Sequence, residues 1–504
     1  MTTNNQNTRK IVILGGGTAG WMAANLLQHH LAPQGFTISL IESPDIPTVG
    51  VGEGSTPQLR QFFQTLGIAE QDWMPACNAT YKNGISFVNW SAKPGFDEYF
   101  HAFPSAPDRQ TAVRFLQNCM ARRRGHNVDA HPNRYFLSAT LAQQALSPKP
   151  KGQARVAINY AYHFDSVLLG KYLAKIAINS GVKHIQAKCD KCHNHANGEI
   201  KSIELHTGEQ IEGQLFIDCS GFRSVLLQQH LAVGFKSYQH GLFNDSAIAM
   251  PSSNEEVIQS QTLSTALSHG WAWQIPLTNR IGNGYVYSSQ FISADQAEQE
   301  LRTKLGLLDH AISAKHLSMK IGRVQQHWAK NCLAVGLSQG FIEPLEATAL
   351  HLVQETIESF VSAFSAGKFT QQHQQQFNQR LNARFDGIRD YIVCHYKVNS
   401  RNDSEYWRAN RHNSNISDSL QNILQSWDQG GDITTEINRQ QIAGYYPAVS
   451  WHCLLAGYGR FPDMHTAQHQ TTTTDENLLH IDGFIQQCAS GFQTHASALT
   501  FGSN

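Results

Sequence analysis

The stretch Ile11–Gly20, which reads IVILGGGTAG, decides the fold of this 504-residue chain. Its four leading apolar residues predict a short strand, and the pattern Gly-x-Gly-x-x-Gly follows at once. Apolar residues then recur at helical spacing from Trp21, and Thr37–Ile41 predicts a second strand that ends on Glu42. Strand, glycine turn, helix, strand and acidic residue in this order predict a dinucleotide-binding turn of the Rossmann type.

Each part of this turn has its own physical task. The first glycine permits the tight turn, the second lets the backbone approach a pyrophosphate, and the third allows the helix to pack closely. The N-terminus of the helix favours the phosphate charge, and the acidic residue accepts a hydrogen bond from ribose hydroxyls. The predicted cofactor contacts are Gly15, Gly17, Thr18, Ala19, Gly20 and Glu42.

Two later segments favour FAD over NAD as the cofactor. Gly50–Glu53 is a second glycine-rich segment, with Gly52 as a further predicted contact, and Asp218–Gly221 follows a later predicted strand. A single Rossmann turn to which distant strands return fits FAD better than NAD. The chain has no second such turn for NAD(P)H, which implies that a separate reductase reduces the flavin.

Composition excludes several classes of protein. The 39 basic and 39 acidic residues balance, and only 15% of the chain is charged, which argues against a nucleic-acid binder or a basic membrane-surface protein. The sequence contains no apolar run of about 18 residues, which is the length that predicts a membrane span. The polar N-terminus and nine scattered cysteines predict a cytoplasmic protein with reduced thiols.

The last third of the chain is predicted to be mainly helical. Leu350, Val353, Ile357 and Phe360 share one apolar helix face, and the glutamine-rich Gln371–Gln379 is interpreted as an exposed helix face. We expect a cofactor domain over residues 1–350 with inserted substrate-contacting segments, and a helical substrate domain over 351–504 packed on it.

Several motifs together resemble the flavin-dependent tryptophan halogenases, in the family's order and over nearly the whole chain. The Trp-x-Trp-x-Ile-Pro element is the most specific, because aromatic FAD hydroxylases share the glycine turn but lack it. The resemblance implies an α/β fold, with an FAD-binding Rossmann-like domain of the aromatic-hydroxylase and halogenase type. The matching residues are Gly15–Trp21, Gly50–Glu53, Lys82, Tyr162–Asp165, Asp218–Gly221, Trp271–Pro276, Phe341–Glu346, Ser400–Asp403 and Ala456–Gly457.

The resemblance implies roles for four of these residues. Trp271 and Trp273 point the same way from a strand and would separate the flavin from the organic substrate; taken alone, they read as core aromatics. Lys82 would receive hypohalous acid and present its halogen, as a haloamine or through a hydrogen bond; by itself it reads as a surface lysine. Glu346 would face Lys82 and take the ring proton, although its position also suits an ordinary helix start.

The same helix start predicts a halide site. Free N–H groups around Thr348 and Ala349 carry partial positive charge. The family usually reads Glu-Ser-Thr-Gly here, whereas this chain has Ala347 and Ala349. If the last position needs a positive φ, alanine strains it, so halide affinity and the preference for chloride or bromide stay open. By resemblance Leu337 would touch the flavin; otherwise it is a core leucine.

The predicted substrate side departs further from the family. His101 and Phe103 match a ring-stacking pair, and Tyr446 is the counterpart of a stacking tryptophan; both segments could equally be core aromatics. Thr434–Gly444 is short and lacks the tyrosine pair and the glutamate that clamp the amino-acid group of tryptophan. The resemblance therefore implies an electron-rich arene, more an indole without that group than free tryptophan.

One cysteine motif could indicate a haem or metal site. Cys189–His193 (CDKCH) spells a haem-attachment motif or half a zinc site, but no second cysteine pair follows at zinc spacing. We therefore expect no metal.

The function predicted is an FADH2-dependent halogenase that uses oxygen and chloride or bromide and relies on a separate flavin reductase. The alternatives are an FAD monooxygenase that hydroxylates its arene and a non-catalytic flavoprotein. The natural substrate, the ring position, attachment of the substrate to a carrier protein and the oligomeric state, with a homodimer as one option, stay open.

Overall fold

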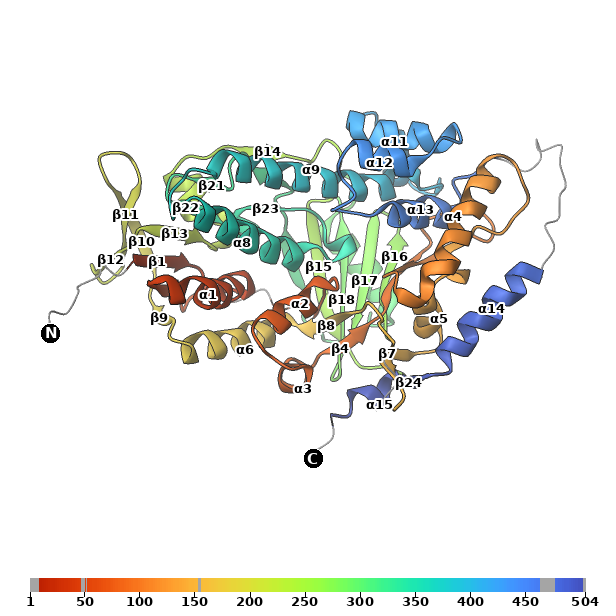
Figure 1. Cartoon of the computed structure of the whole chain (residues 1–504), viewed down its shortest axis with the longest axis horizontal. Helices are drawn as coiled ribbons and strands as arrows, with labels where there is room; N and C mark the ends of the chain where they lie inside the picture. Colours follow the sequence, from red (N-terminus) through yellow and green to blue (C-terminus); the bar gives the residue numbers. More distant parts are fainter. Residues whose placement is uncertain (1–8, 47–49, 51, 153–155, 463–475, 502–504) are drawn as a thin grey trace.

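The first predicted strand, β1, lies at the centre of a mainly parallel sheet, and the predicted turn and helix follow it. The computed structural model describes residues 9–46, 50, 52–152, 156–462 and 476–501 (Figure 1); Val51 of the second glycine segment lies outside them. Strand β1 lies between β2 and β13 and is parallel to both. The sheet runs in the order β21 (Trp328–Ala329), β22 (Cys332–Ala334), β13 (Leu215–Asp218), β1 (Arg9–Leu14), β2 (Phe36–Glu42) and β9 (Lys183–Gln186).

Three helices pack beside this sheet. Helix α1 (Thr18–Leu31) contacts both α6 (Ser166–Asn179) and α8 (Ala349–Ala366). Helix α6 begins at Ser166. The reason is local: the Asp165 carboxylate accepts hydrogen bonds from the N–H groups of Val167 and Leu168 and caps the helix. Phe164 and Asp165 belong to strand β8 (Ala161–Asp165).

A second, mainly antiparallel sheet stands beside the first (Figure 1). It carries the Trp-x-Trp element on its central strand β17, and its buried face joins the large hydrophobic core. The order is β19 (Lys315–Ser318), β15 (Ser246–Ser252), β18 (Ile281–Tyr287), β17 (Gly270–Pro276), β16 (Thr262–Leu267), β5 (Gly84–Val88) and β6 (Glu98–Ala102). Smaller sheets are β3 (Gly52–Gly54), β8 and β4 (Thr80–Lys82); β10 (Cys189–Asn194), β11 (Ile200–Leu205) and β12 (Gln210–Glu212); β14 (Phe235–Ser237), β20 (Gly322–Val324) and β23 (Gly340–Phe341); and β7 (Leu146–Pro150) with β24 (Phe492–Thr494).

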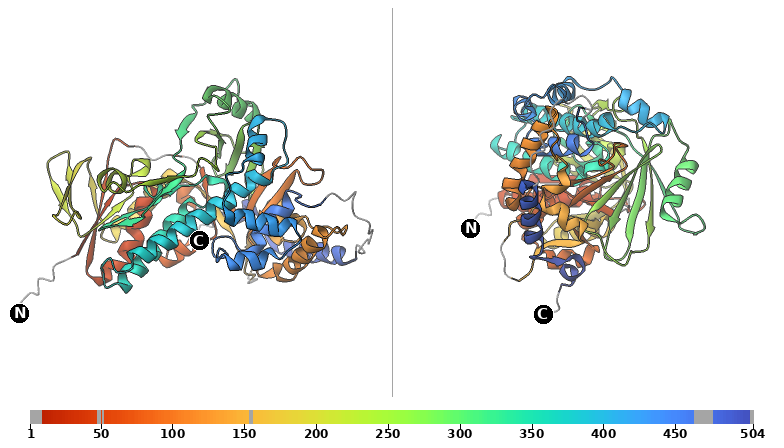
Figure 2. Two further views of the ribbon diagram at one scale, coloured as in Figure 1. Left: turned by 90° about the horizontal axis from the view of Figure 1, so that it is seen from above. Right: turned by 90° about the vertical axis from the view of Figure 1, so that its right-hand side faces the viewer.

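The chain after residue 348 is mainly helical. Helices α8 and α9 (Gln374–Val398) both extend between the cofactor sheet and the antiparallel sheet (Figures 1 and 2). The predicted boundary at residue 350 falls inside α8, which packs on α1 of the cofactor sheet. The glutamine-rich segment enters α9 only at Gln374, and the residues before it form a turn. The later helices are α10 (Glu405–His412), α11 (Asp418–Asp428), α12 (Ile433–Arg439), α13 (Ala448–Gly457), α14 (Glu476–Ala489) and α15 (His495–Leu499).

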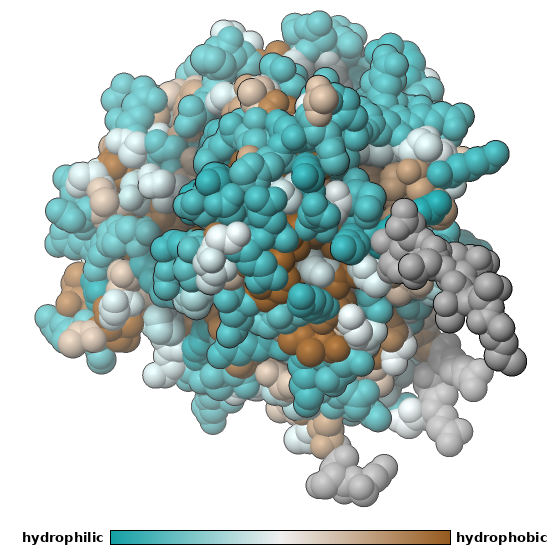
Figure 3. Space-filling view, turned by 90° about the vertical axis from the view of Figure 1, so that its left-hand side faces the viewer, coloured by the Kyte–Doolittle hydropathy of each residue, from teal (hydrophilic) through white to brown (hydrophobic). Residues whose placement is uncertain are grey.

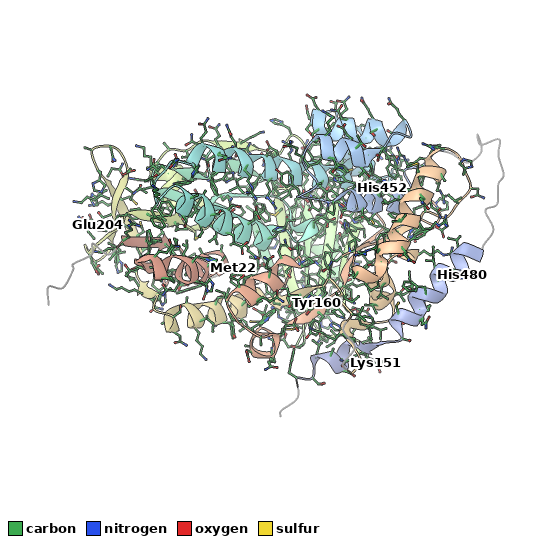
Figure 4. All side chains as sticks on the ribbon, in the orientation of Figure 1. Met22, Lys151, Tyr160, Glu204, His452 and His480 are labelled. Carbon is green, nitrogen blue, oxygen red and sulfur yellow. The ribbon has the colours of Figure 1, made fainter. Side chains whose placement is uncertain are left out.

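The remaining helices lie within the first 305 residues of the chain. Within the described residues, no helix is both long and apolar enough to cross a membrane. Figure 4 places Met22 of α1 and His452 of α13 at well-separated points along the long axis. These helices are α2 (Gln58–Thr65), α3 (Glu70–Trp73), α4 (Arg109–Arg123), α5 (Leu137–Gln143) and α7 (Ala294–Leu305).

Candidate active site

The glycine turn has the geometry that its sequence predicts. Gly15 has φ +116°, and a Cβ there would lie 2.2 Å from the Cys219 carbonyl oxygen. A Cβ on Gly20 would lie 1.9 Å from the Gly15 oxygen, so the turn and the helix touch through backbone. A Cβ on Gly17 would meet nothing within 4 Å, and Gly17 begins α1 without a side-chain cap. The turn therefore leaves open N–H groups beside free space, as a bound phosphate requires.

A cavity of about 620 Å³ joins this turn to the Trp-x-Trp element and to Lys82. Glu42 lines this cavity, and its carboxylate lies 3.0 Å from His184 Nε2. The cavity, its glycine turn and its acidic residue fit an FAD molecule. The predicted residues that line it are Gly15, Gly17, Thr18, Ala19, Glu42, Gly52, Lys82, Trp271, Trp273, Leu337 and Ala349.

Trp271 and Trp273 lie side by side in the cavity wall. Their ring centroids are 6.1 Å apart, and both side chains are buried. Gly284 on the neighbouring strand makes room, since a Cβ there would lie 2.0 Å from the Trp273 ring. Trp271 Nε1 donates to Glu343 Oε2 at 3.2 Å, whereas Trp273 Nε1 has no protein partner. Trp271 is thus fixed by a carboxyl group behind it.

Sequence reasoning gave Glu343 no role of its own. The side chain is fully buried, and burial raises its pKa to about 7. Tyr396 and Asn244 also donate hydrogen bonds to its Oε2. Glu343 therefore joins the Trp-x-Trp strand to helix α9. No sequence signal could identify this contact, because its partners lie between 53 and 99 residues away.

Lys82 is buried, and the structure thereby excludes the surface-lysine alternative. It ends strand β4, and only 1% of its surface is exposed. Its Nζ donates to the Ser55 carbonyl oxygen at 3.1 Å. Burial lowers the pKa of Lys82 to about 7, while the negative charge of Glu346 opposes this shift. A substantial fraction of the amine is therefore neutral near pH 7.

Two histidines contact the carboxylate of Glu346. Its Oε1 lies 2.9 Å from His395 Nε2 and 3.5 Å from His101 Nδ1. Burial raises the pKa of Glu346, and the charges of His101 and Lys82 oppose this shift. Burial also lowers the pKa of both histidines. Tyr458 lies 2.8 Å from His395 Nδ1; a neutral His395 that donates to Glu346 accepts from this hydroxyl.

Sequence reasoning also missed His395 and Tyr458. Neither lies in a motif: His395 of α9 contacts Glu346, and Tyr458, just after α13, contacts His395. His101 was predicted as a ring-stacking residue, and its contact with Glu346 is an addition to that prediction.

The residue with a positive φ near the predicted halide site is Ala347. Ala349 is the first residue of α8 and is helical, whereas Ala347 has φ +55°. The condition under which alanine would strain position 349 is therefore not met: the chain turns before the helix, just after Glu346. Thr348 stands at the N-cap without a side-chain hydrogen bond to the helix. Ala347 and Ala349 line the cavity, so the N-terminus of an 18-residue helix lies at its wall.

Aromatic groups surround Glu346 and Lys82. The Phe103 ring lies 5.9 Å from Lys82 Nζ. Tyr446 stacks face to face on Tyr391 with ring centroids 3.6 Å apart, so one of its two faces is already covered. The Tyr446 hydroxyl and Trp451 Nε1 are buried without protein partners. The region next to Glu346 thus combines apolar rings with unused hydrogen-bonding groups.

Comparison with known proteins agrees with this geometry. The family model for tryptophan halogenase matches residues 10–474. The tryptophan 6-halogenase SttH of Streptomyces toxytricini is 36% identical over 480 residues, which cover 90% of both chains. Tar14, a tryptophan C-6 flavin-dependent halogenase from taromycin biosynthesis, superposes with a TM-score of 0.85 at 31% identity over 97% of this chain and 98% of that one. BrvH, a flavin-dependent halogenase from Brevundimonas sp. BAL3, gives 0.82 at 30% identity over 98% of each.

Fold and site define a class of flavin-dependent enzyme, in which one cavity is lined by the glycine turn, two tryptophans and a buried lysine. The chain belongs to the tryptophan halogenase family. It is a flavin-dependent halogenase, and the predicted family, fold class, enzyme class and cofactors are confirmed: FADH2 from a separate reductase, oxygen and halide. The monooxygenase and non-catalytic alternatives are not favoured.

Proposed function

We propose that this enzyme halogenates an electron-rich arene, indole-like and without an amino-acid group, at Lys82 and Glu346. The observation that carries the proposal is the buried Lys82 amine, whose pKa is lowered to about 7 at the wall of the cofactor cavity. A neutral amine in a site that excludes water can receive or hold an electrophilic halogen, whereas an ammonium ion has no free electron pair.

The residues along the cavity have separate tasks in this proposal. Reduced FAD, when bound, supplies the oxidation of halide by oxygen to hypohalous acid. The N–H groups at Thr348 and Ala349 hold the halide beside the flavin. The indoles of Trp271 and Trp273 keep the arene away from the flavin, so that only the small oxidant passes. This separation favours halogenation over direct hydroxylation.

Proton transfer falls to Glu346. The ring of the arene becomes cationic when the halogen adds, and a carboxylate within reach takes the proton that restores aromaticity. The neutral His395, 2.9 Å away, holds the carboxylate in place by donating a hydrogen bond, with His101 on its other side. These two histidines are positioning residues in this proposal.

The substrate assignment depends on what surrounds the aromatic region. SttH is a tryptophan 6-halogenase, whereas in this chain the segment Thr434–Gly444 contains no tyrosine and only one glutamate. That glutamate, Glu436, is paired with Arg439 at 2.6 Å. His101, Phe103 and Tyr446 therefore contact an arene whose amino-acid group, if present, finds no free clamp in this segment. A cytoplasmic location and a homodimer remain predictions.

The test is mass spectrometry of reactions that contain the enzyme, FAD, a flavin reductase with NADH, and bromide or chloride. Indole, tryptophan and phenol serve as substrates. We expect halogenated indole to exceed halogenated tryptophan, and Lys82→Met to remove both products while reduced flavin is still oxidised. A hydroxylated product that persists in Lys82→Met would support the monooxygenase instead, and faster reaction of tryptophan would overturn the substrate assignment.

A further inference from the structure

The first cysteine of the CDKCH motif, Cys189, lies at the wall of the flavin cavity, and the second, Cys192, lies on the same strand. Strand β10, which carries both, pairs with β11 at the end of the molecule opposite α14 (Figures 1 and 4, where Glu204 of β11 is labelled). Figure 3 faces this end, where the surface is mostly hydrophilic with a smaller apolar area near its centre. Cys189 and Asp190 line the cavity together with Glu42.

A β-bulge places the two thiols on one face of the hairpin. Residues three apart in a regular strand point to opposite faces. Here Cys189 pairs with Leu205 and Cys192 with Ile203, while Asp190 is the extra residue without a partner. Leu205 and Ile203 are two apart and both buried, so their partners share the inward face. Both cysteines pack against the same small hydrophobic cluster.

The two thiols are also in contact and chemically unequal. A hydrogen bond from Cys192 lowers the pKa of Cys189, and the same contact raises that of Cys192. The thiolate is the reactive form of cysteine. Neither residue is fully buried, and both are free thiols. Cys219 also lines the cavity, but burial raises the pKa of its thiol.

The metal reading of this motif has no support among the described residues, where no group of three or more His, Cys, Asp or Glu side chains could hold an ion. His193, which would complete a ligand set, is instead paired with Glu204 at 2.6 Å.

We propose that Cys189 and Cys192 are an oxidation site, which hydrogen peroxide converts to a disulfide that loosens FAD binding. The proposal rests on the proposed function only for the source of the oxidant, because reduced flavin and oxygen form peroxide when no substrate consumes the oxidising equivalents. The Cys189 thiolate attacks one peroxide oxygen, the O–O bond breaks, and hydroxide leaves and is protonated to water. The Cys192 thiol then attacks the sulfenic sulfur, forms the S–S bond and releases a second water. Two thiols and one peroxide thus give one disulfide and two waters.

The hairpin geometry explains why the disulfide would affect the cofactor. Leu205 and Ile203, the partners of the two cysteines, are two strand residues apart and therefore about 6.7 Å from each other. The bulge at Asp190 brings Cys189 and Cys192 to a similar separation, near the upper limit of about 6.8 Å between the Cα atoms of a disulfide. Closing the bond therefore tightens β10 at Asp190, which lines the cavity. The segment is tied to the cofactor sheet, since Ala187 N–H donates to the Glu42 carbonyl oxygen at 3.0 Å. Movement of β10 is thus transmitted to the wall beside Glu42.

The test uses the full-length protein with added hydrogen peroxide, in the absence of halide and arene. After blocking of free thiols and proteolysis, mass spectrometry should find Cys189 and Cys192 joined. Cys488→Ser, remote and half-exposed, should form the same disulfide, whereas Cys192→Ser should stop at a sulfenic acid on Cys189 that dimedone traps. Free, alkylatable thiols at both positions after this treatment would overturn the proposal.

The second measurement is FAD affinity by fluorescence titration. We expect peroxide to raise the Kd for FAD several-fold in the wild type, reversibly with dithiothreitol, and to leave the Kd of Cys192→Ser unchanged. An equal change in Cys192→Ser, or a disulfide without any change in Kd, would overturn the link to the cofactor. Because these assays need no halogenation, an inactive enzyme that forms the disulfide refutes only the proposed function.

Discussion

Replacing Lys82 by methionine should stabilise the fold at neutral pH. Burial lowers the pKa of this amine from 10.5 to about 7, and each pKa unit corresponds to about 1.36 kcal/mol. The unfolded chain binds the Lys82 proton more tightly than the folded chain does. The free-energy cost of burying the lysine is therefore at its maximum below pH 7, and it disappears as the pH rises from 7 through 10.5. The cost is about 4 kcal/mol at pH 7 and about 2 kcal/mol at pH 9.

Methionine has a similar length and carries no charge. The substitution removes the hydrogen bond from Lys82 Nζ to the Ser55 carbonyl oxygen, which is worth about 1 kcal/mol. We therefore expect Lys82→Met to raise the free energy of unfolding by about 3 kcal/mol at pH 7 and about 1 kcal/mol at pH 9. Urea unfolding followed by tryptophan fluorescence measures both values. Lys175→Met, at an exposed position on α6, is the control and should show no such dependence on pH. A Lys82→Met protein that is less stable than the wild type at pH 7, or equally shifted at both pH values, would refute the reasoning.

Three further changes test other parts of the site. Glu346→Gln should lower the rate of halogenation about 100-fold, as loss of a proton acceptor does, with an unchanged Kd for FAD in fluorescence titration; an unchanged rate would remove its role as base. Gly15→Ala should abolish FAD binding in the same titration, because its Cβ would lie 2.2 Å from the Cys219 oxygen at φ +116°. Ala347→Gly should raise the free energy of unfolding, measured in urea, by about 0.5 kcal/mol. The φ of +55° costs alanine about 1–2 kcal/mol, and the greater chain entropy that glycine loses on folding offsets part of the gain. A less stable variant would contradict this account.

The parts of the fold that the sequence predicted are those set by local pattern. The run IVIL, the glycines after it and Glu42 lie within 32 residues, and their spacing alone carries the geometry of the turn. The start of α6 is also decided locally, because the Asp165 side chain caps the helix there.

The predictions for the site were limited by long-range contacts. The motif residues Lys82 and Glu346 could be named, but burial is a property of the folded chain, and Lys82 looked solvated beside Asn83 and Tyr81. His395 and Glu343 were missed for the same reason, since their partners come from other elements. Whether Ala349 needs a positive φ could not be decided beforehand, because the motif shows which residues depart from the family but not which one has a positive φ, and that residue is Ala347.

The buried polar groups around Glu346 are best explained by the chemistry they enclose. A buried lysine, a buried carboxylate and two buried histidines cost stability, and apolar residues of similar volume would pack in their place at lower free energy. The same burial keeps Lys82 partly neutral, which an exposed lysine near pH 7 is not. It also shields hypohalous acid from the many nucleophiles at the protein surface. The instability of this region and its reactivity therefore have one cause, so any substitution that lets water reach Lys82 should raise its pKa and lower the rate of halogenation together.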